Sequence, residues 1–532
     1  MCGTQADGRI AAANVLGRHA GAQKTLSGAA RRHGLLLSPH RFRLDPRLDW
    51  VASHAPEGYL IHALCVHEAS GQAVGPAIRV NGSIVAECQR EDGLLGWVSK
   101  ADITSRRAWT GMSSLAWLRE VSSLSQDELV ARFGFAPNGD RSFAERVQHF
   151  CVTTATLIRH GSAFEKVDVV IASDLDTLAA GLVLSDLHAA PLIYDAHEYW
   201  PDAPPDCSQA ETRFWQRYER SLVPNVDAAF TVSQPLARFM SQRYEREFVN
   251  VPNCEPLRTL PPTTSGHRAA RTKVRFLYQG LFARGRGLEA LIKLWPKTSA
   301  RAELYLRGPH NEYSLSFRSI AEQTGLLNTR IFFCDPVNEE DLVEAARSFD
   351  VGVLAYEPVS INNRYCCPNK ISQYCAAGLP LICNRLEYVE SLIADADFGL
   401  AADLNDEDGF SDAVTRLAED DDLRRRLASK AQRFFLSRFN WQVASRPMYE
   451  AMSALGENSA VRSPAEREMA FYYAPPEPPV DLPPEAPRVD PTAKTRQADA
   501  SSRVFHFLWH RIPRKLRLRV IKEFERRHLQ QE

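Results

Sequence analysis

The sequence has no surplus of charge of either sign. Its 532 residues contain 64 Lys and Arg against 65 Asp and Glu, which gives a formal net charge of −1. A domain that binds nucleic acid through its overall field carries a basic surplus, so this balance excludes that class and no nucleic-acid partner is expected. Any electrostatic partner must be held by a local patch.

Long hydrophobic runs and ordered cysteine patterns are also absent. No stretch approaches the ~20 apolar residues that span a bilayer, and the opening residues lack the apolar core of a secretion signal. Residues 1–33 are rich in Ala and Gly, and we expect a disordered lead. The 11 cysteines are an odd number and fit neither a disulfide framework nor a zinc site. These absences predict a cytoplasmic protein with reduced thiols.

Short apolar runs alternate with helical patterns from residue 34 onward. The patterns predict strands at residues 35–37, 59–66, 168–173, 192–195 and 228–232, and helices at residues 47–55, 142–159 and 177–187. Asn81-Gly82 is a hairpin signal within residues 78–86. Strands that alternate with helices predict a parallel α/β sheet, so residues 34–251 are interpreted as a first Rossmann-like domain.

A break rich in proline separates this domain from a second one. Residues 252–272 contain four prolines and are interpreted as an interdomain linker. Strand patterns then resume at residues 274–278, 302–306, 331–333, 351–355 and 381–382, so residues 273–455 form a second Rossmann-like domain with a closing helix. Two such domains facing each other leave a cleft between the carboxyl ends of their strands, where ligands bind.

The carboxyl-terminal part has a different composition. Eight prolines between residues 475 and 491 predict a stiff linker over residues 456–502. Residues 503–532 carry nine Arg and Lys against three acids, with apolar residues at every fourth position. A basic amphipathic helical tail favours contact with an anionic membrane surface, which would make the protein peripheral on the inner face of a membrane. The alternative is that the tail docks onto the chain itself or onto a partner.

Two loops carry candidate ligand-binding residues. In the run at 278–287, Gly280 and Gly287 lie between a predicted strand and a helix, next to Arg284 and Arg286. Exposed N–H groups at a helix start beside two arginines make an anion site, although a plain strand-to-helix turn is the alternative. The run is neither a Walker loop nor a G-x-G-x-x-G fingerprint.

The second loop precedes a predicted helix that ends near Gly378. Asn369 and Lys370 open this helix, and Gln373 follows Lys370 after one turn. The Lys370 ammonium adds a point charge for a phosphate group. The Gln373 amide can bond sugar hydroxyl groups.

Five motifs of the chain resemble, in order, those of the family 4 retaining glycosyltransferases, which have the GT-B double-Rossmann fold. They are the strand and helix at 168–178 (D-V-V-H-A-H-D-L-D-T-L in the family), Y-D-x-H-E at 194–198, V-P-N at 251–253, the glycine loop at 280–287, and the P-N-K and A-A-G-L-P segments at 368–380. The similarity spans residues 35–455. Bacterial relatives of this type commonly build surface polysaccharide on lipid-linked acceptors.

The resemblance implies a retaining, hexosyltransferase-type enzyme. A nucleotide-sugar co-substrate would bind mainly on the second domain and a glycan or lipid-linked acceptor on the first, with no metal and no other cofactor. Arg286 and Lys370 would neutralise the leaving diphosphate. Gly280, Arg284, Gly287, Asn369 and Gln373 would bind the donor. His197 is the candidate that positions the sugar or the acceptor, and Asp174, Asp195 and Glu198 lie with it in the cleft.

Four positions depart from the family pattern. Ser173 stands where the family often has histidine, Leu281 replaces an arginine, and Tyr365 and Gln373 occupy the positions of the E-x7-E carboxylates. These departures motivate an alternative, a degenerate GT-B protein that binds a nucleotide sugar or a partner enzyme without turnover. A third hypothesis is a nucleotide-sugar 2-epimerase on the same fold, whose motifs the chain lacks.

The pair Asp174-Leu-Asp176 resembles the D-x-D motif with which GT-A glycosyltransferases hold a divalent cation. That fold has a different order of elements. We therefore expect Asp174 to cap the helix that follows it, without a metal ion.

Overall fold

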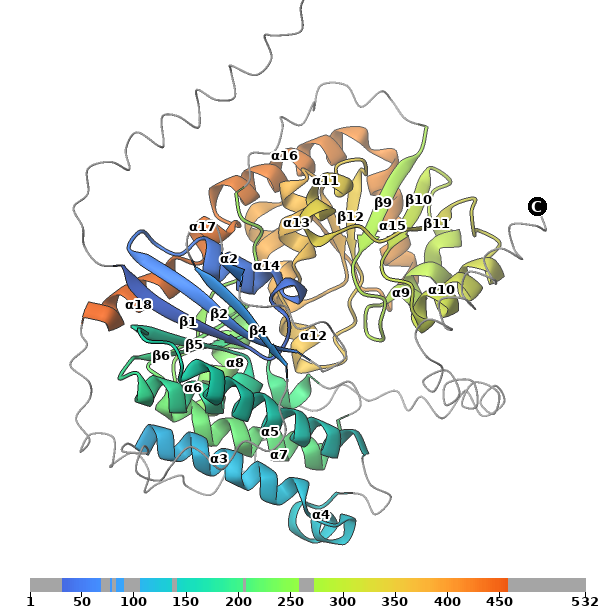
Figure 1. Ribbon diagram of the computed structural model, residues 1–532. Helices are drawn as coiled ribbons and strands as arrows, with labels where there is room; N and C mark the ends of the chain where they lie inside the picture. Colours follow the sequence, from blue (N-terminus) through green and yellow to red (C-terminus); the bar gives the residue numbers. More distant parts are fainter. Residues whose placement is uncertain are drawn as a thin grey trace, which may run out of the picture. The chain divides into compact units, whose positions relative to one another are not determined.

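The computed structural model describes residues 31–67, 77–78, 83–89, 106–135, 141–203, 207–257 and 272–457. Expectations for the lead before residue 31, for most of residues 252–272, for the proline-rich linker and for the basic tail lie outside the described residues. The described part builds two sheets, which both belong to the compact unit Met1–Ala470 (Figure 1).

The first sheet has the strand order β3-β4-β2-β1-β5-β6-β7-β8. Its strands are β1 (Arg32–Ser38), β2 (Tyr59–His67), β3 (Ala77–Ile78), β4 (Ile84–Gln89), β5 (Val169–Ser173), β6 (Leu192–Ala196), β7 (Ala228–Thr231) and β8 (Val249–Asn250). Neighbouring strands are parallel except β3 and β4, which pair antiparallel as the predicted hairpin requires. β1 begins at Arg32, two residues before the predicted domain boundary.

The helices of this lobe cover both faces of the sheet. They are α2 (Pro46–Ser53), α3 (Arg106–Ser122), α4 (Gln126–Phe133), α5 (Arg141–Gly161), α6 (Leu175–Leu187), α7 (Gln209–Leu222) and α8 (Gln234–Tyr244). Val170 and Tyr194 face the core that the long helices α5 and α6 cover, whereas Ile171 and Ile193 face the core that includes Trp50 of α2. Because both faces are buried, the central strands read as continuous apolar runs, which made them easy to predict.

The second sheet is parallel and has the order β11-β10-β9-β12-β13-β14. Its strands are β9 (Val274–Gln279), β10 (Ala302–Arg307), β11 (Ile331–Cys334), β12 (Val351–Leu354), β13 (Leu381–Cys383) and β14 (Gly399–Ala401). Its helices are α9 (Leu288–Leu294), α10 (Glu312–Gln323), α11 (Leu342–Ala346), α12 (Ile361–Tyr365), α13 (Lys370–Ala376), α14 (Glu387–Ala396), α15 (Glu407–Glu419) and α16 (Asp421–Ser437). The predicted fold class, α/β with two Rossmann-like sheets, is confirmed.

The closing segment belongs with the first lobe. The sequence predicts that the closing segment completes the second domain. This segment forms the helices α17 (Trp441–Ala444) and α18 (Arg446–Glu457). Instead Trp441, Met448 and Met452 enter the core around Trp50, and the Tyr449 hydroxyl donates to the Val51 carbonyl at 3.1 Å. The apolar face of a helix shows that the helix is buried but does not show against which lobe, so only the tertiary structure assigns it.

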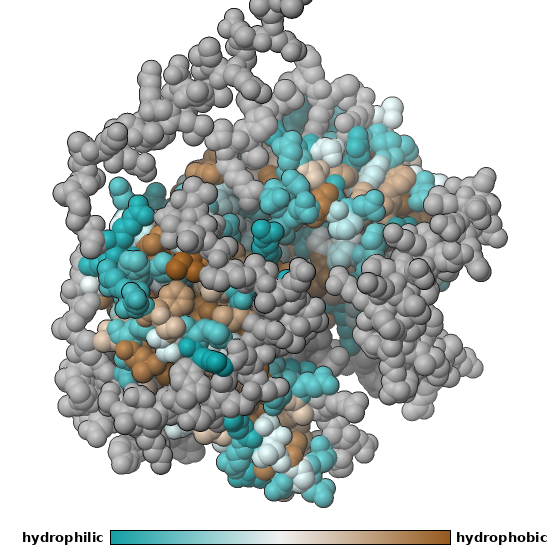
Figure 2. Space-filling view, viewed as in Figure 1, coloured by the Kyte–Doolittle hydropathy of each residue, from teal (hydrophilic) through white to brown (hydrophobic). Residues whose placement is uncertain are grey.

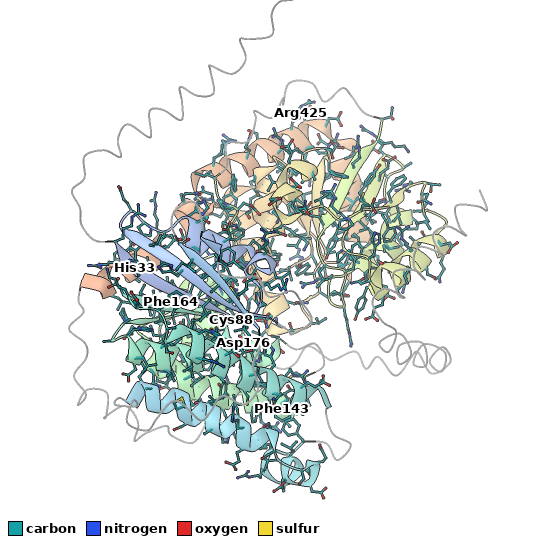
Figure 3. The ribbon with its side chains drawn as sticks, in the orientation of Figure 1. His33, Cys88, Phe143, Phe164, Asp176 and Arg425 are labelled. Atoms are coloured by element: carbon teal, nitrogen blue, oxygen red, sulfur yellow. The ribbon has the colours of Figure 1, made fainter. Side chains whose placement is uncertain are left out.

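None of the described helices is long and apolar enough to cross a membrane. On the face drawn in Figure 2, hydrophilic side chains are interspersed with small hydrophobic patches. Figure 3 marks the two ends of the first sheet, because His33 lies near the start of β1 whereas Asp176 follows the carboxyl end of β5. The carboxyl ends are where the polar side chains gather.

Candidate active site

A buried ion pair anchors the strand ends of the first lobe. Arg47 of α2 is 2% exposed and donates from Nε and Nη2 to the two carboxylate oxygens of Asp195, at 2.8 and 2.7 Å. Burial alone would raise the pKa of Asp195, but Arg47 and His197 outweigh burial and hold that pKa well below its usual range. Asp195 is therefore ionised, and its oxygens are taken by the protein. This geometry favours a positioning role over the predicted contact with the acceptor.

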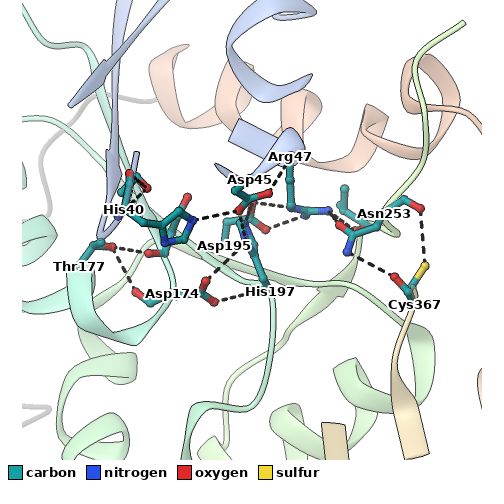
Figure 4. Close-up of polar contacts among 12 residues, drawn as sticks. His40, Asp45, Arg47, Asp174, Thr177, Asp195, His197, Asn253 and Cys367 are labelled. Carbon is teal, nitrogen blue, oxygen red and sulfur yellow. Dashed lines mark hydrogen bonds and ion pairs between the residues drawn. The ribbon is translucent and has the colours of Figure 1, made fainter. Parts of the chain in front are cut away.

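His197 lies among three carboxylates (Figure 4). Its Nδ1 is 2.9 Å from Asp45 and 3.5 Å from Asp174, and its Nε2 is 3.3 Å from Asp195. Burial alone would lower the pKa of His197, but the three carboxylates raise it well above the usual value. The ring is therefore an imidazolium with both nitrogens engaged. It can orient neighbouring groups, but it is not placed as a general base.

Asp174 occupies the first position before α6, as predicted, yet its side chain does not cap that helix. Its φ of 63° and ψ of 169° turn the carboxylate toward the end of β6, where Oδ1 accepts the His197 backbone N–H at 2.8 Å. The expected cap is therefore wrong, because a left-handed backbone directs the side chain elsewhere. Burial, which is the largest effect, raises the pKa of Asp174 to about 6.

Glu198 is held in place by residues on either side of it. On one side, the His197 N–H donates to Oδ1 of Asp174 at 2.8 Å. On the other, the Tyr199 N–H donates to Oδ1 of Asn362 at 2.7 Å. The Asn362 amide in turn donates to the Tyr199 carbonyl at 2.9 Å, so α12 of the second lobe clamps this loop. The Glu198 carboxyl makes no hydrogen bond or ion pair with the described residues. Burial and the nearby Asp174 raise its pKa to about 8.

Two cations of the second lobe converge on one tyrosine. The guanidinium of Arg286 lies 4.2 Å from the ring centroid of Tyr356, and Nζ of Lys370 donates to the Tyr356 hydroxyl at 3.0 Å. Neither cation has a carboxylate partner among the described residues. Lys370 is 7% exposed and also lies 5.0 Å from the ring of Tyr278. A buried and a half-buried cation that lack a carboxylate partner among the described residues indicate a site for an anion.

Two glycines of the loop 280–287 are favoured by their positive φ, and Gly287 is also required by close packing. A Cβ at Gly280, whose φ is 130°, would lie 2.6 Å from Nζ of Lys370. A Cβ at Gly287, whose φ is 68°, would lie 1.8 Å from the carbonyl oxygen of Ala355. Arg284 is exposed on the same loop. The start of the loop, at Gly280, thus lies directly against Lys370.

The predicted donor residues at the start of α13 differ in their surroundings. The side chain of Asn369 forms no hydrogen bond with the described residues, so it is available to a ligand. In contrast, Gln373 is 2% exposed, and its amide accepts from Gln279 at 3.0 Å and donates to Glu255 and Glu339, each at 3.3 Å. These contacts favour a structural role for Gln373 over the predicted bond to a sugar hydroxyl.

Arg47 also connects the first lobe to the chain crossover and the second lobe. Its Nη1 donates to the Val251 carbonyl at 2.8 Å and to Oδ1 of Asn253 at 3.0 Å. The Asn253 amide then donates to the Cys367 carbonyl at 3.3 Å, three residues before Lys370 (Figure 4). A continuous chain of polar contacts therefore runs from His197 and Asp195 to the start of α13.

Several site residues have no motif that marks them. Arg47 and Asp45 lie in a segment that reads only as the start of a helix, and Tyr356 follows a strand without a recognisable pattern. An arginine near the start of a helix gives no sign of burial, so nothing in the sequence singles out Arg47. Among the described residues, no group of three or more His, Cys, Asp or Glu side chains is arranged to hold a metal ion.

Comparisons with known proteins agree with this architecture. Residues 119–254 match the glycosyl transferase 4-like domain, and residues 273–420 match the domain of glycosyl transferases group 1. Among solved structures, a sucrose-phosphate synthase from Thermosynechococcus elongatus superposes with a TM-score of 0.53 at 13% identity, over 80% of this chain and 99% of that one. A trehalose-phosphate synthase from Burkholderia vietnamiensis gives 0.51 at 13% identity, over 79% and 100%. These structural similarities show that the chain has the GT-B fold.

The chain belongs to the family 4-like glycosyltransferases, as the motifs predicted. A similar curated protein is a phosphatidyl-myo-inositol mannosyltransferase of Mycolicibacterium smegmatis, 26% identical over 44% of this chain and 60% of that protein. Another is a D-inositol 3-phosphate glycosyltransferase of Corynebacterium glutamicum, 24% identical over 47% and 64%. The matched region thus spans less than two thirds of each relative.

Proposed function

We propose that this chain transfers a hexose from a nucleotide-sugar donor to a glycan or lipid-linked acceptor, with retention of the anomeric configuration. The observation that carries this proposal is the convergence of Arg286 and Lys370 on Tyr356, without a carboxylate partner among the described residues. A nucleoside diphosphate supplies the anion that such a pair of cations lacks.

The proposed reaction assigns a role to each cation. The bond between the sugar C1 and the diphosphate oxygen breaks, and its electron pair stays on the diphosphate. The acceptor oxygen bonds C1, and the proton of that hydroxyl passes to the leaving diphosphate. Negative charge grows on the diphosphate as the bond breaks, so cations fixed there stabilise the transition state more than the ground state. Arg286 and Lys370 are held by Tyr356 for this purpose.

The acceptor is proposed to bind at the strand ends of the first lobe. Glu198 and Asp174 have carboxyl groups there, and His197 and Asp195 hold the loop between them. The positive charge of Arg286 lowers the pKa of Glu198, although burial and Asp174 raise it more. The proposed donor and acceptor sides therefore lie close together at these two residues. Asn369, Arg284 and the glycine loop complete the proposed donor side.

The first test is a thermal-shift panel of UDP-, GDP-, ADP- and CMP-sugars, with and without Mg²⁺. We expect one nucleotide to raise the melting temperature without the metal. With that donor, Arg286→Ala and Lys370→Ala should each lower the transfer rate by ~10²–10³. Arg425→Ala and Lys293→Ala, which change exposed cations of the same lobe, serve as matched controls. Full activity of both site variants would refute the assignment.

A second hypothesis, binding without turnover, is favoured by the surroundings of Gln373 and Tyr365. The Gln373 amide is occupied by protein partners, and the Tyr365 ring packs near Phe239 of α8. Neither position offers the donor a carboxylate. A nucleotide-dependent shift without release of nucleoside diphosphate, across a panel of acceptors, would favour this hypothesis over transfer.

We also propose that the protein is cytoplasmic, acts in surface-polysaccharide synthesis and contacts an anionic membrane through residues 503–532. The support is the net basic, amphipathic sequence of this segment and a relative whose name includes a lipid acceptor. The full chain should sediment with vesicles that contain phosphatidylglycerol and not with pure phosphatidylcholine vesicles. Replacement of Arg514, Lys515, Arg517 and Arg519 by Gln should abolish the difference; unchanged sedimentation would refute the role of the tail.

A further inference from the structure

Two histidines of the neighbouring strands β1 and β2 are hydrogen-bonded to each other. Nδ1 of His33 lies 2.9 Å from Nε2 of His62, and the two rings stack with their centroids 5.2 Å apart. His62 is 5% exposed, whereas His33, near the start of β1, is half-buried. Neither ring forms an ion pair with a carboxylate of the described residues. A positive charge on this pair would therefore lack a counter-ion there.

The backbone of β4 determines where the protons of the two rings lie. Ile84, the first residue of β4, donates its N–H to Nδ1 of His62 at 3.1 Å. This nitrogen must therefore be unprotonated, so the proton of the neutral His62 ring is on Nε2 and is donated to Nδ1 of His33. Both rings must be neutral for the two hydrogen bonds to coexist. A proton added to either ring breaks one of them.

The surroundings of the pair do not favour a charged ring. Burial lowers the pKa of His62, and the charge of His33 lowers it further. Phe164 packs against His62 with ring centroids 5.8 Å apart. The nearby charged groups are Asp168, which accepts the backbone N–H of His33 at 2.6 Å, and Lys166, whose Nζ is 3.7 Å from that carboxylate. The acid is thus already compensated by a cation.

The strand held by His62 also contacts the segment that enters the candidate active site. Glu87 of β4 accepts the backbone N–H of Phe42 at 3.3 Å. Phe42 begins the short 3₁₀ helix Phe42–Leu44, which Asp45 follows directly. The Asp45 carboxylate is 2.9 Å from Nδ1 of His197. A change at the start of β4 can therefore reach the carboxylates around His197 through Glu87.

We infer that His33 and His62 form a pH-sensitive latch, which holds β4 to the first sheet while both rings are neutral and releases it in acid, together with the segment that leads to Asp45. Histidines freed by this opening have a pKa of about 6.5. The open state therefore binds protons that the closed state excludes, so opening becomes more favourable as the pH falls below about 6.5. This inference requires neither the donor nor the acceptor of the proposed reaction.

Hydrogen exchange with mass spectrometry on the full chain tests the latch. Exchange is measured at pH 7.5 and pH 5.0 and corrected for the intrinsic pH dependence of amide exchange. Protection of β4 should fall roughly tenfold at pH 5.0, and residues 42–45 should lose protection with it. β5, in the same lobe, is the reference for wider opening. Unchanged protection of β4, or an equal loss in β5, would overturn the inference.

Two variants assign the effect to the two rings. His62→Asn has an amide oxygen that can accept from Ile84 but does not titrate, so β4 and residues 42–45 should stay protected at pH 5.0. His33→Gln removes one of the two titratable rings at a half-buried position and should reduce the loss of protection. His310→Asn, which changes a 35% exposed histidine of the second lobe, is the control and should retain the wild-type loss. A wild-type loss in either latch variant would overturn the inference, and His33→Gln decides it if His62→Asn does not fold.

Discussion

The Arg47 guanidinium and the Asp195 carboxylate form a bidentate pair that is at most 2% exposed and lies where the chain crosses between lobes. The pair is satisfied on every side, since Arg47 also bonds Val251 and Asn253 and lies 5.3 Å from the Trp441 ring. The crossover, the closing segment and the strand ends thus share one cation. The strand ends of the first lobe cannot move far without disturbing this pair.

Arg47→Met should destabilise the protein strongly. Loss of one partner leaves the Asp195 charge buried and uncompensated, which costs about 3–5 kcal/mol. The measurement is chemical denaturation of the full chain, monitored by tryptophan fluorescence. Arg132→Met is the control, because it removes a pair with Glu120 in which both side chains are at least half exposed, and such a pair contributes ~1 kcal/mol or less. An equal effect of the two substitutions would contradict the interpretation.

Gly280→Ala should disable the proposed donor side without unfolding the chain. The new Cβ would lie 2.6 Å from Nζ of Lys370, so the ammonium must move away from Tyr356. We expect a loss of nucleotide-dependent thermal shift and a fall in transfer of roughly the size that removal of Lys370 causes, ~10²–10³.

Gly378→Ala is the control for this substitution. Gly378 also has a positive φ, 73°, but a Cβ there meets nothing within 4 Å. Its cost is limited to the backbone strain of a left-handed residue, about 1 kcal/mol. If Gly378→Ala reduced nucleotide binding as much as Gly280→Ala, strain in the backbone and not the position of Lys370 would explain the loss.

Glu219→Gln should flatten the pH dependence of stability. Glu219 is fully buried and accepts from the hydroxyls of Tyr194 and Tyr244; burial raises its pKa to about 7. In the unfolded chain the pKa of a glutamate is about 4.3. Between about pH 4.3 and 7 the folded state therefore binds more protons than the unfolded state. As a result, the free energy of unfolding falls as pH rises through this range. The variant has no such proton, and the free energies of unfolding at pH 5 and pH 8 measure the change.

Ionisation of Glu219 should lower the free energy of unfolding of the wild type by on the order of 3 kcal/mol between pH 5 and pH 8. The free energy of unfolding of Glu219→Gln, minus that of the wild type, should therefore be larger at pH 8 than at pH 5. Glu120→Gln, in which an exposed carboxylate changes, should leave the wild-type pH profile unaltered. A parallel shift of stability at both pH values would show that Glu219 does not titrate in this range.

Met452→Ala should destabilise the first lobe although the residue follows the second lobe in sequence. Met452 is fully buried in the core around Trp50, so its truncation costs about 2–5 kcal/mol. Hydrogen exchange with mass spectrometry should show faster exchange in β1 and β2 and unchanged exchange in β9 and β10. Leu436→Ala, at a 57% exposed position, should change neither; faster exchange confined to β9 and β10 would contradict the assignment of α18.

The alternation of strands and helices, the two Rossmann-like sheets and the motifs at 168–176, 194–198 and 368–370 could be read from the sequence alone, whereas helices such as α3 and α4 could not. The features read from the sequence follow from local chemistry, because apolar runs specify buried strands and glycines specify tight loops. Only the tertiary structure decided that His197 is enclosed by carboxylates, that Asp174 turns away from α6, that Gln373 is saturated and that α18 packs on the first lobe. Each of these depends on groups far apart in the chain, such as Arg47 and Asp195, and charge, burial and pairing at such distances leave no local pattern in the sequence.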